Sequence, residues 1–428
     1  MFKTMKYFQI REHSEKPKNI KEELPNLNNM LPKLKVTIAE GGPYERGLKH
    51  GAYFRDEIKH NLTSFWQHVL DLGASRNSLL RLVQNIHKSD LNETSLLYFS
   101  GISEGAGVAL PDVLTLNLLK PVLYPDECTV LIAFGDSTAN GKTIMLKNSD
   151  KIGSERFKGD RFYKNKELNV LILEKPDNGN TIAAIAAAGE EAIKIGLNDK
   201  GVAFGSNIAR TVELSARTLN VSQIRALDRG WLGKEGLTKA NTAREAAQLV
   251  LKSLAERPMS TPGNIEFVDP KKGFIIEGSY DRLAFQEVDQ GTHARTNKFE
   301  ILKDLNDPFD VSSYVRYVRS IELLRMNRGK IDVPMMIRFS QDHENGPGLN
   351  SICRHSPNYT DETSLAAAVM ELDPVKPESS IFHAALGKPC RAWNDPKGHI
   401  SIRMNELPVI PPEFLNGDTF KKFYIEEL

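Results

Sequence analysis

The chain has 428 residues, enough for two or three average domains or for one large α/β domain. Its composition, 40% hydrophobic and 26% charged, is ordinary for a globular protein, and 56 basic against 55 acidic residues leave a net charge of +1. A field of that size would not gather nucleic acid or anionic lipid, so we expect neither nucleic acid nor a membrane as a partner.

Short segments of the sequence disfavour a membrane-spanning protein and a secreted one. The longest apolar runs are too short to span a bilayer, and charged residues from Arg11 onward interrupt the N-terminal stretch before the core of a signal peptide can form. We therefore expect a cytoplasmic location. Cys128, Cys353 and Cys390 lie far apart in the sequence, so no disulfide framework and no metal site are predicted, and the last two are interpreted as small buried residues.

The first part of the chain is predicted to be a leader followed by helices. Residues 1–33 are polar and rich in Lys, Glu, Pro and Asn, which is typical of a poorly ordered segment. A short strand is expected at 35–40, and apolar residues at helical spacing predict helices over 45–72, 77–86 and 93–100. Gly47 and Gly51, four residues apart, indicate close packing of the first helix against another rather than a ligand contact.

The character of the sequence changes at Cys128. Short β-rich runs follow, separated by turn signals at 139–141, 177–179 and 198–201, and this hairpin spacing favours an antiparallel sheet over βαβ units. A helical block is expected over 222–257, with Asn241 or Thr242 as the N-cap of its second helix. Strands are then predicted at 264–269, 273–279 and 282–288, a helix from near Ser312, and strands at 364–372 and 380–387. The pattern predicts an α+β protein with antiparallel sheets.

The hairpin around Asn140-Gly141 carries the first candidate for chemistry. Pairing the apolar runs 130–134 and 143–147 places Cys128 opposite residues 149–153, and Asn148 and Asp150 share a face because they are two apart. A structural cysteine would more often lie in mid-strand among apolar neighbours, whereas Cys128 follows a turn-forming, charged segment. The pattern leaves a catalytic and a structural role for Cys128 open.

A catalytic Cys128 could be activated in two ways. A papain-like enzyme needs a histidine base, and none of the ten histidines stands in a setting that singles it out. Alternatively, Cys128 becomes the first residue of a chain, and its own α-amino group, with a reference pKa of ~7.7–8.0, takes the thiol proton at neutral pH. That route requires cleavage of the backbone before Cys128, and a strand that begins at the nucleophile suits it.

Eight segments between residues 36 and 394 resemble one known family. They are GGPYERGLKHG (41–51), ISEGAGVALPDVLTLNL (102–118), ECT (127–129), KNSD (147–150), GLNDKGVAFGSN (196–207), ARTNKF (294–299), SSYVRYVRSIELL (312–324) and ALGKPCRAW (385–393). In order and spacing they resemble the acyl-coenzyme A:6-aminopenicillanic acid acyltransferase family of the Ntn hydrolase superfamily, which is related to the bile-salt hydrolases.

This resemblance implies a four-layer αββα fold with two antiparallel sheets flanked by helices. It implies self-cleavage between Glu127 and Cys128, which would separate a mainly helical α segment (34–127) from a catalytic β-chain (128–428), the two fragments staying associated. The substrate would be an N-acyl amide or a coenzyme A thioester, attacked through an acyl-enzyme on Cys128 and released by hydrolysis or by acyl transfer. No cofactor and no metal are implied.

The resemblance also assigns roles to single residues. Cys128 would be the nucleophile and, through its freed amine, the base, and Asp150 would hold that amine. Asn207 and Asn297 would donate to the oxyanion, a contact worth ~2.7–4 kcal/mol of barrier. Arg316 would anchor Asp150 or a substrate carboxylate through its fork of donors, with Arg319 as its rival and one of the two a solvated helix charge.

The sequence departs from the family pattern at three positions, and two rival readings follow. Glu127 stands where many relatives have Gly, which bears on the efficiency of the cleavage. Arg295 and Lys298 stand where the family often has His, and these two changes imply a changed specificity. The first rival is an unprocessed binding protein on the same fold with an inert Cys128. The second is a conventional Cys–His hydrolase with an uncut chain.

Overall fold

The protein is described by a computed structural model over residues 34–71, 73–86, 91–123, 127–152, 155–158, 161–164, 167–216, 227–355 and 362–406. The leader expected at 1–33 lies outside these ranges. Within them, no helix is both long enough and apolar enough to cross a bilayer.

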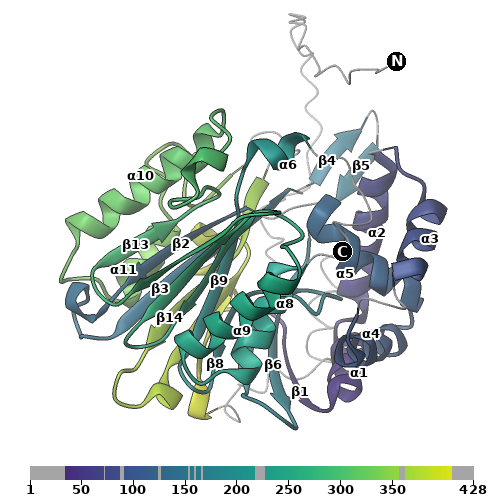
Figure 1. The fold of residues 1–428 in the computed structure, drawn as a ribbon, viewed down its shortest axis with the longest axis horizontal. Coiled ribbons are helices and arrows are strands. Elements are labelled where there is room, and N and C mark those ends of the chain that lie inside the picture. The colour runs from purple at the N-terminus through teal and green to yellow at the C-terminus, as the bar shows by residue number, and fades with distance from the viewer. Residues whose placement is uncertain are drawn as a thin grey trace, which may run out of the picture.

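Two large β-sheets form the centre of the fold (Figure 1). The strands of sheet A, in spatial order, are β1 (Val36–Gly41), β6 (Asn169–Pro176), β7 (Ile182–Ala187), β8 (Ile193–Asn198), β9 (Ala203–Ile208), β10 (Gly263–Val268), β11 (Gly273–Gly278) and β12 (Leu283–Val288). Those of sheet B are β13 (Thr292–Arg295), β2 (Glu127–Ala133), β3 (Thr143–Ile152), β14 (Glu362–Leu372), β15 (Ile381–Leu386) and β16 (His399–Arg403). A separate hairpin joins β4 (Glu155–Lys158) to β5 (Arg161–Lys164).

The predicted antiparallel pairing is confirmed for every described pair of strands except one. β1 runs parallel to β6, with Val36 opposite Leu171. The prediction missed this pair because β1 reaches its partner only after a long helical segment, and a parallel pair requires such a crossover.

The helices are grouped along the chain. They are α1 (Pro43–Tyr53), α2 (Arg55–Asp71), α3 (Arg76–Ile86), α4 (Glu93–Ala106), α5 (Leu110–Leu123), α6 (Val212–Ala216), α8 (Arg229–Lys239), α9 (Ala243–Glu256), α10 (Val311–Met326), α11 (Val333–Ser340) and α12 (Pro389–Ala392). The helix predicted over 45–72 is two helices that meet at Phe54. Thr242, rather than Asn241, caps α9, since its side chain accepts a hydrogen bond from the Glu245 amide.

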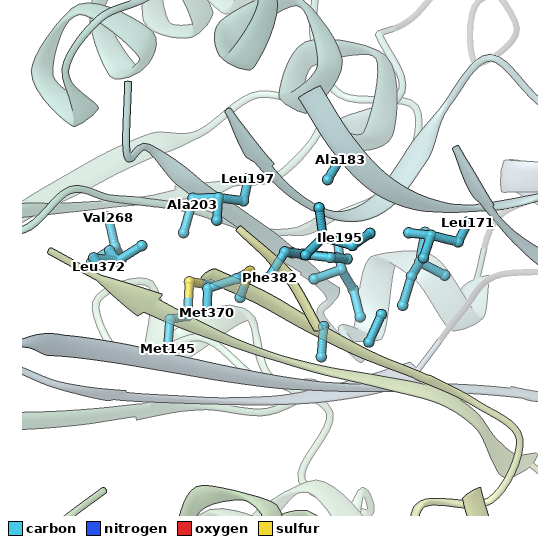
Figure 2. Packing of buried hydrophobic residues seen from close by; sticks show 14 of the residues in the cluster. Met145, Leu171, Ala183, Ile195, Leu197, Ala203, Val268, Met370, Leu372 and Phe382 are labelled. Atoms are coloured by element: carbon cyan, nitrogen blue, oxygen red, sulfur yellow. The ribbon is translucent and has the colours of Figure 1, made fainter. Parts of the chain in front are cut away.

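Four layers follow from where the apolar side chains are buried. The inner faces of the two sheets share one core, in which Met145 and Met370 of sheet B face Ile195 and Leu197 of sheet A (Figure 2). The outer face of sheet A is covered by α1–α5 and by α8–α9, and the outer face of sheet B by α10–α12 (Figure 1). The predicted α+β sandwich of two sheets flanked by helices is therefore confirmed, with the parallel β1–β6 pair as its one deviation.

Glycines allow α1 and α4 to touch, as predicted from the spacing of Gly47 and Gly51. A β-carbon at Gly47 would lie 2.1 Å from the Tyr98 carbonyl oxygen, and one at Gly51 would lie 2.5 Å from that of Ile102. These distances are far inside van der Waals contact, so only glycine permits this approach of the two backbones.

Candidate active site around Cys128

The first two residues of β2 lie opposite the end of β3. Cys128 pairs with Ser149 and Glu127 pairs with Asp150, so the predicted register of Cys128 with residues 149–153 is confirmed. Side chains alternate along a strand, and Cys128 therefore points to the same side as Val130, into the space between the sheets. Glu127, Asp150 and Asn148 point to the opposite side, toward the helices that cover sheet B. Candidate groups thus surround the Glu127–Cys128 peptide bond from both faces.

On the side of β2 that faces away from β3, the backbone of Cys128 is held by side chains rather than by a strand. The ladder between β2 and β13 ends at the pair Val130–Arg295, after which the second chain turns away. In its place, the Cys128 amide donates to Oδ1 of Asn297 at 3.2 Å and the Cys128 carbonyl accepts from Nη1 of Arg316 at 2.9 Å. The nitrogen of the predicted scissile bond is therefore held by one side-chain amide.

Arg316, and not Arg319, is the arginine of α10 at this site. Its buried guanidinium also donates to Oδ1 of Asn297 at 2.7 Å and to Oγ1 of Thr129 at 2.9 Å. Arg319 instead pairs with Asp342 at 2.8 Å and with Glu322 at 2.7 Å, so it is not the solvated charge that was expected. No ion pair between Arg316 and Asp150 is found among the described residues, since the guanidinium contacts the Cys128 carbonyl and Asn297 instead. The alternative role of Arg316, anchoring a substrate carboxylate, stays a prediction.

Glu127 is ionised and enclosed by three arginines. Arg210 binds one carboxylate oxygen, through Nε at 2.7 Å and through Nη2, and Arg354 binds the other, with Arg316 at 3.5 Å. Burial alone would raise the pKa of Glu127, but the guanidinium groups of Arg354, Arg210 and Arg316 outweigh it and lower this pKa to about 2. The glutamate that replaces the common glycine before the nucleophile is thus matched by positive charge.

Asp150 keeps one carboxylate oxygen uncommitted. Ser364 donates to Oδ1 at 2.6 Å, while Oδ2 lies 4.0 Å from Arg354 and has no hydrogen-bond partner among the described residues. Burial raises the pKa of Asp150, against the opposing effect of Arg354 and Arg316. Asp150 directly follows Ser149, the cross-strand partner of Cys128, and its buried oxygen without a hydrogen bond is suited to accept a new cation.

The two predicted oxyanion asparagines lie on different elements. Asn207 is at the end of β9 on the face of Gly205, where a β-carbon would lie 3.4 Å from Val130, so it faces the same space as Cys128. Its amide nitrogen donates to the Arg295 carbonyl at 3.3 Å, and that of Asn297 donates to the Ile208 carbonyl at 2.9 Å. Each side-chain amide nitrogen carries two hydrogens, so each asparagine keeps one hydrogen that these two bonds do not use.

A small cavity of about 50 Å³ adjoins Cys128. Among its lining residues, cationic groups outnumber acidic ones; the cationic ones are Lys120, Lys147, Lys151, Lys194 and Arg229. Glu167 and Glu190 bind several of these lysines, and Lys147 donates to the Lys194 carbonyl at 2.6 Å. A volume of this size holds a water molecule or two, well below the ~300–1,000 Å³ of ligand pockets.

No histidine is among the described residues that line this cavity. A larger cavity of about 300 Å³ lies between α4, α5 and α8 and is not lined by Cys128. Sequence patterns contain no signal for Arg210, Arg354 or Ser364, because each is a lone polar residue whose importance comes only from the fold.

Comparisons with known proteins add the following similarities. No family model matches the chain. An uncharacterized protein of Archaeoglobus fulgidus is 25% identical over 203 residues, which are 41% of this chain and 32% of that protein, so the chain spans about a third of the length of this relative.

Among solved structures, the chain aligns with three named enzymes. Penicillin V acylase from Agrobacterium tumefaciens has a TM-score of 0.38 at 11% identity, covering 65% of this chain and 87% of the other. The Caenorhabditis elegans ortholog of N-acylethanolamine-hydrolyzing acid amidase has a TM-score of 0.35 at 16% identity, covering 57% and 92%. Conjugated bile acid hydrolase from Clostridium perfringens has a TM-score of 0.37 at 11% identity, covering 65% and 93%.

Proposed function

We propose that this protein is a self-processing amide hydrolase or acyltransferase in which cleavage after Glu127 makes Cys128 an N-terminal nucleophile. The observation that carries the proposal is the set of buried groups on the Glu127–Cys128 peptide. Asn297 binds its nitrogen, Arg316 binds the next carbonyl, and arginines bind the Glu127 side chain. A cysteine with a purely structural role would need none of these contacts, since an ordinary strand partner would satisfy its backbone.

Processing requires one acyl shift and one hydrolysis. The Cys128 sulfur attacks the Glu127 carbonyl carbon, a C–S bond forms as the C–N bond breaks, and the thiol proton passes to the departing amine. Water then hydrolyses the thioester to the Glu127 carboxylate, the thiol and a free α-amine on Cys128. Asn297 orients the nitrogen for this step, because its Oδ1 already accepts the amide hydrogen.

Turnover uses the amine that processing releases. The amine takes the thiol proton, the sulfur attacks a substrate amide or thioester carbonyl, and the leaving group (the nitrogen of an amide or the sulfur of a thioester) receives the proton as the acyl-enzyme forms. Water or an amine acceptor then releases the acyl group. The guanidinium of Arg316 disfavours the protonated ammonium nearby, which keeps the amine available as a base. Asp150, whose Oδ2 has no hydrogen-bond partner among the described residues, would orient this amine.

The surroundings of Cys128 support a substrate with an anionic group near the scissile carbonyl. The lysines and Arg229 around the 50 Å³ cavity give it an excess of positive charge, which favours a carboxylate or phosphate. A coenzyme A thioester would also meet this condition. The cavity of the intact chain is too small for such molecules, so the proposal requires it to widen after cleavage.

Active-site labelling tests the identity of the nucleophile. Purified protein is treated with an electrophilic acyl probe, digested and mapped by mass spectrometry, with Cys128→Ala as the matched control. The expected result is one label on Cys128 of the wild type and none on the variant. Labelling of Cys353 or Cys390 instead, or amidase activity retained by Cys128→Ala, would sink the proposal. A survey of single His→Ala variants separates the conventional Cys–His enzyme, because the proposed mechanism needs no histidine.

A further inference from the structure

Four metal-binding side chains come together on the outer side of sheet B, away from the Cys128 thiol. The ligand atoms of His343, Cys353, His355 and Cys390 all lie within 4.8 Å of one another. The two imidazole Nε2 atoms are 3.1 Å apart, and Nε2 of His355 is 3.6 Å from the sulfur of Cys353 and 3.3 Å from that of Cys390. The separate buried cysteines expected from the sequence are therefore members of one cluster.

The three contacts of His355 match the ligand separations of a tetrahedral zinc site. With Zn–N bonds of ~2.05 Å and Zn–S bonds of ~2.3 Å, tetrahedral ligand atoms are separated by about 3.3 Å for two nitrogens and about 3.5 Å for nitrogen and sulfur. The contacts of His355 lie within ~0.3 Å of both values. Two thiolates and two neutral imidazoles form one of the ligand sets that structural zinc sites use, and the thiolates disfavour the harder Mg²⁺ and Ca²⁺.

The cluster ties together two segments that carry little regular structure. Three ligands come from residues 343–355, which follow α11, and Cys390 comes from the four-residue helix α12. Backbone bonds pre-shape the loop, since the Cys353 amide donates to the Asp342 carbonyl at 3.1 Å and the His355 amide to that of Gly348 at 3.3 Å. Cys353 is fully buried, so its thiol lies in a fixed interior position. A bound ion would join this loop to α12.

The loop matters because Arg354 lies between two of the ligands. Its guanidinium binds the Glu127 carboxylate and lies 4.0 Å from Oδ2 of Asp150. We propose that His343, Cys353, His355 and Cys390 bind a structural Zn²⁺ ion that fixes the loop 341–355 and thereby presents Arg354 to the peptide before Cys128. The metal has no role in the chemistry at Cys128.

Metal analysis of the full chain tests the site directly. Protein purified without added chelator should contain about one zinc per chain, and replacement by Co²⁺ should give the intense visible bands of tetrahedral cobalt with a thiolate-to-cobalt charge-transfer band. Cys353→Ser and Cys390→Ser should each lower the zinc content at least ~10-fold after dialysis. Cys128→Ala and His293→Ala, a thiol and an imidazole outside the cluster, should leave it unchanged.

Several results would overturn the proposal. One is a wild-type chain that contains no zinc and takes up no Co²⁺. Another is a Cys353–Cys390 disulfide, detected in the mass of the unreduced protein. A third is full zinc content in both of the single variants His343→Ala and Cys390→Ser. If Cys353→Ser does not fold, the half-buried His343 gives the decisive variant. Because Cys128→Ala keeps the cluster intact, failure of the metal site and failure of the proposed hydrolase are distinguishable.

Hydrogen exchange tests the link to Arg354. Chelation of the metal should speed amide exchange over 342–355 at least ~10-fold while leaving β9 and β10 unchanged, because only the loop depends on the ion. Equal exchange of this loop with and without chelator, under conditions that remove the metal, would contradict the positioning role.

Discussion

The two polar ends of Asn297 can be separated by substitution. Its Oδ1 accepts from the Cys128 amide and from Arg316, and its Nδ2 donates to the Ile208 carbonyl. Asn297→Ala removes the shared acceptor of two buried donors, one of them charged, and the loss of such an acceptor costs about 1–3 kcal/mol. If one such loss falls on the transition state for processing, the rate falls by about 5- to 150-fold.

Asn297→Asp distinguishes the acceptor from the donor. It keeps an oxygen for the Cys128 amide and for Arg316 but removes the amide hydrogens, so processing should continue while turnover falls ~10²–10³-fold, the cost of one oxyanion donor. Asn264→Ala is the matched control, because the Asn264 amide supports the same turn through the Thr296 and Lys298 carbonyls at 3.2 Å without contacting Cys128.

The assay is a denaturing gel over time for processing, and release of the amine product for turnover. We expect slow cleavage for Asn297→Ala and near-normal cleavage for both Asn297→Asp and Asn264→Ala. Equal, mild effects of all three variants on both steps would show that the Cys128 amide contact has no part in the reaction.

Three further predictions use other parts of the structure. Cys128→Ala should give an uncut, inactive chain and Cys128→Ser a slowly cut one, as seen on a gel, since a hydroxyl is the weaker nucleophile. The arginine pairing that lowers the pKa of Glu127 stabilises the fold at pH values above ~4.3, the pKa of an unfolded glutamate, and this stabilisation is lost as the pH falls toward about 2. The unfolding free energy of the wild type should therefore fall, relative to that of Glu127→Gln, between these two pH values. A difference between the two proteins that stays constant with pH would contradict the arginine pairing. Gly47→Ala should lower the unfolding free energy by about 1–3 kcal/mol through collision with the Tyr98 carbonyl, whereas Gly348→Ala, which meets no atom within 4 Å, should have little effect in a urea titration.

Much of this fold could be predicted because turns and helices are determined by residues close together in the sequence. The Asn140-Gly141 turn fixed the β2–β3 register, and with it the pairing of Cys128 with Ser149. Helical spacing located α3 and the first half of α4 but joined α1 and α2 into one helix. The spacing of Gly47 and Gly51 indicated the close approach of α1 to another helix, which is α4. The parallel β1–β6 pair was missed because no feature of the strand itself encodes a partner 135 residues away.

The site was only partly predictable for the same reason. Asn207, Asn297 and Arg316 were named through resemblance, and the structure brings Asn297 and Arg316 onto the Cys128 peptide. Arg210 and Arg354 were missed because a single arginine in a loop has no pattern. The cluster of His343, Cys353, His355 and Cys390 was missed because its ligands are spread over two segments rather than the close pairs of familiar zinc motifs.

The central claim, that the backbone opens before Cys128, is tested most directly by the intact mass of the purified chain under denaturing conditions, followed by N-terminal sequencing. By share of 47.9 kDa, cleavage predicts fragments of about 14 kDa and about 34 kDa if no leader is lost, with the larger beginning at Cys128. The fragments should co-elute under native conditions, since both contribute strands to sheet A. An intact chain after long incubation, or a larger fragment that begins at any other residue, would contradict the account.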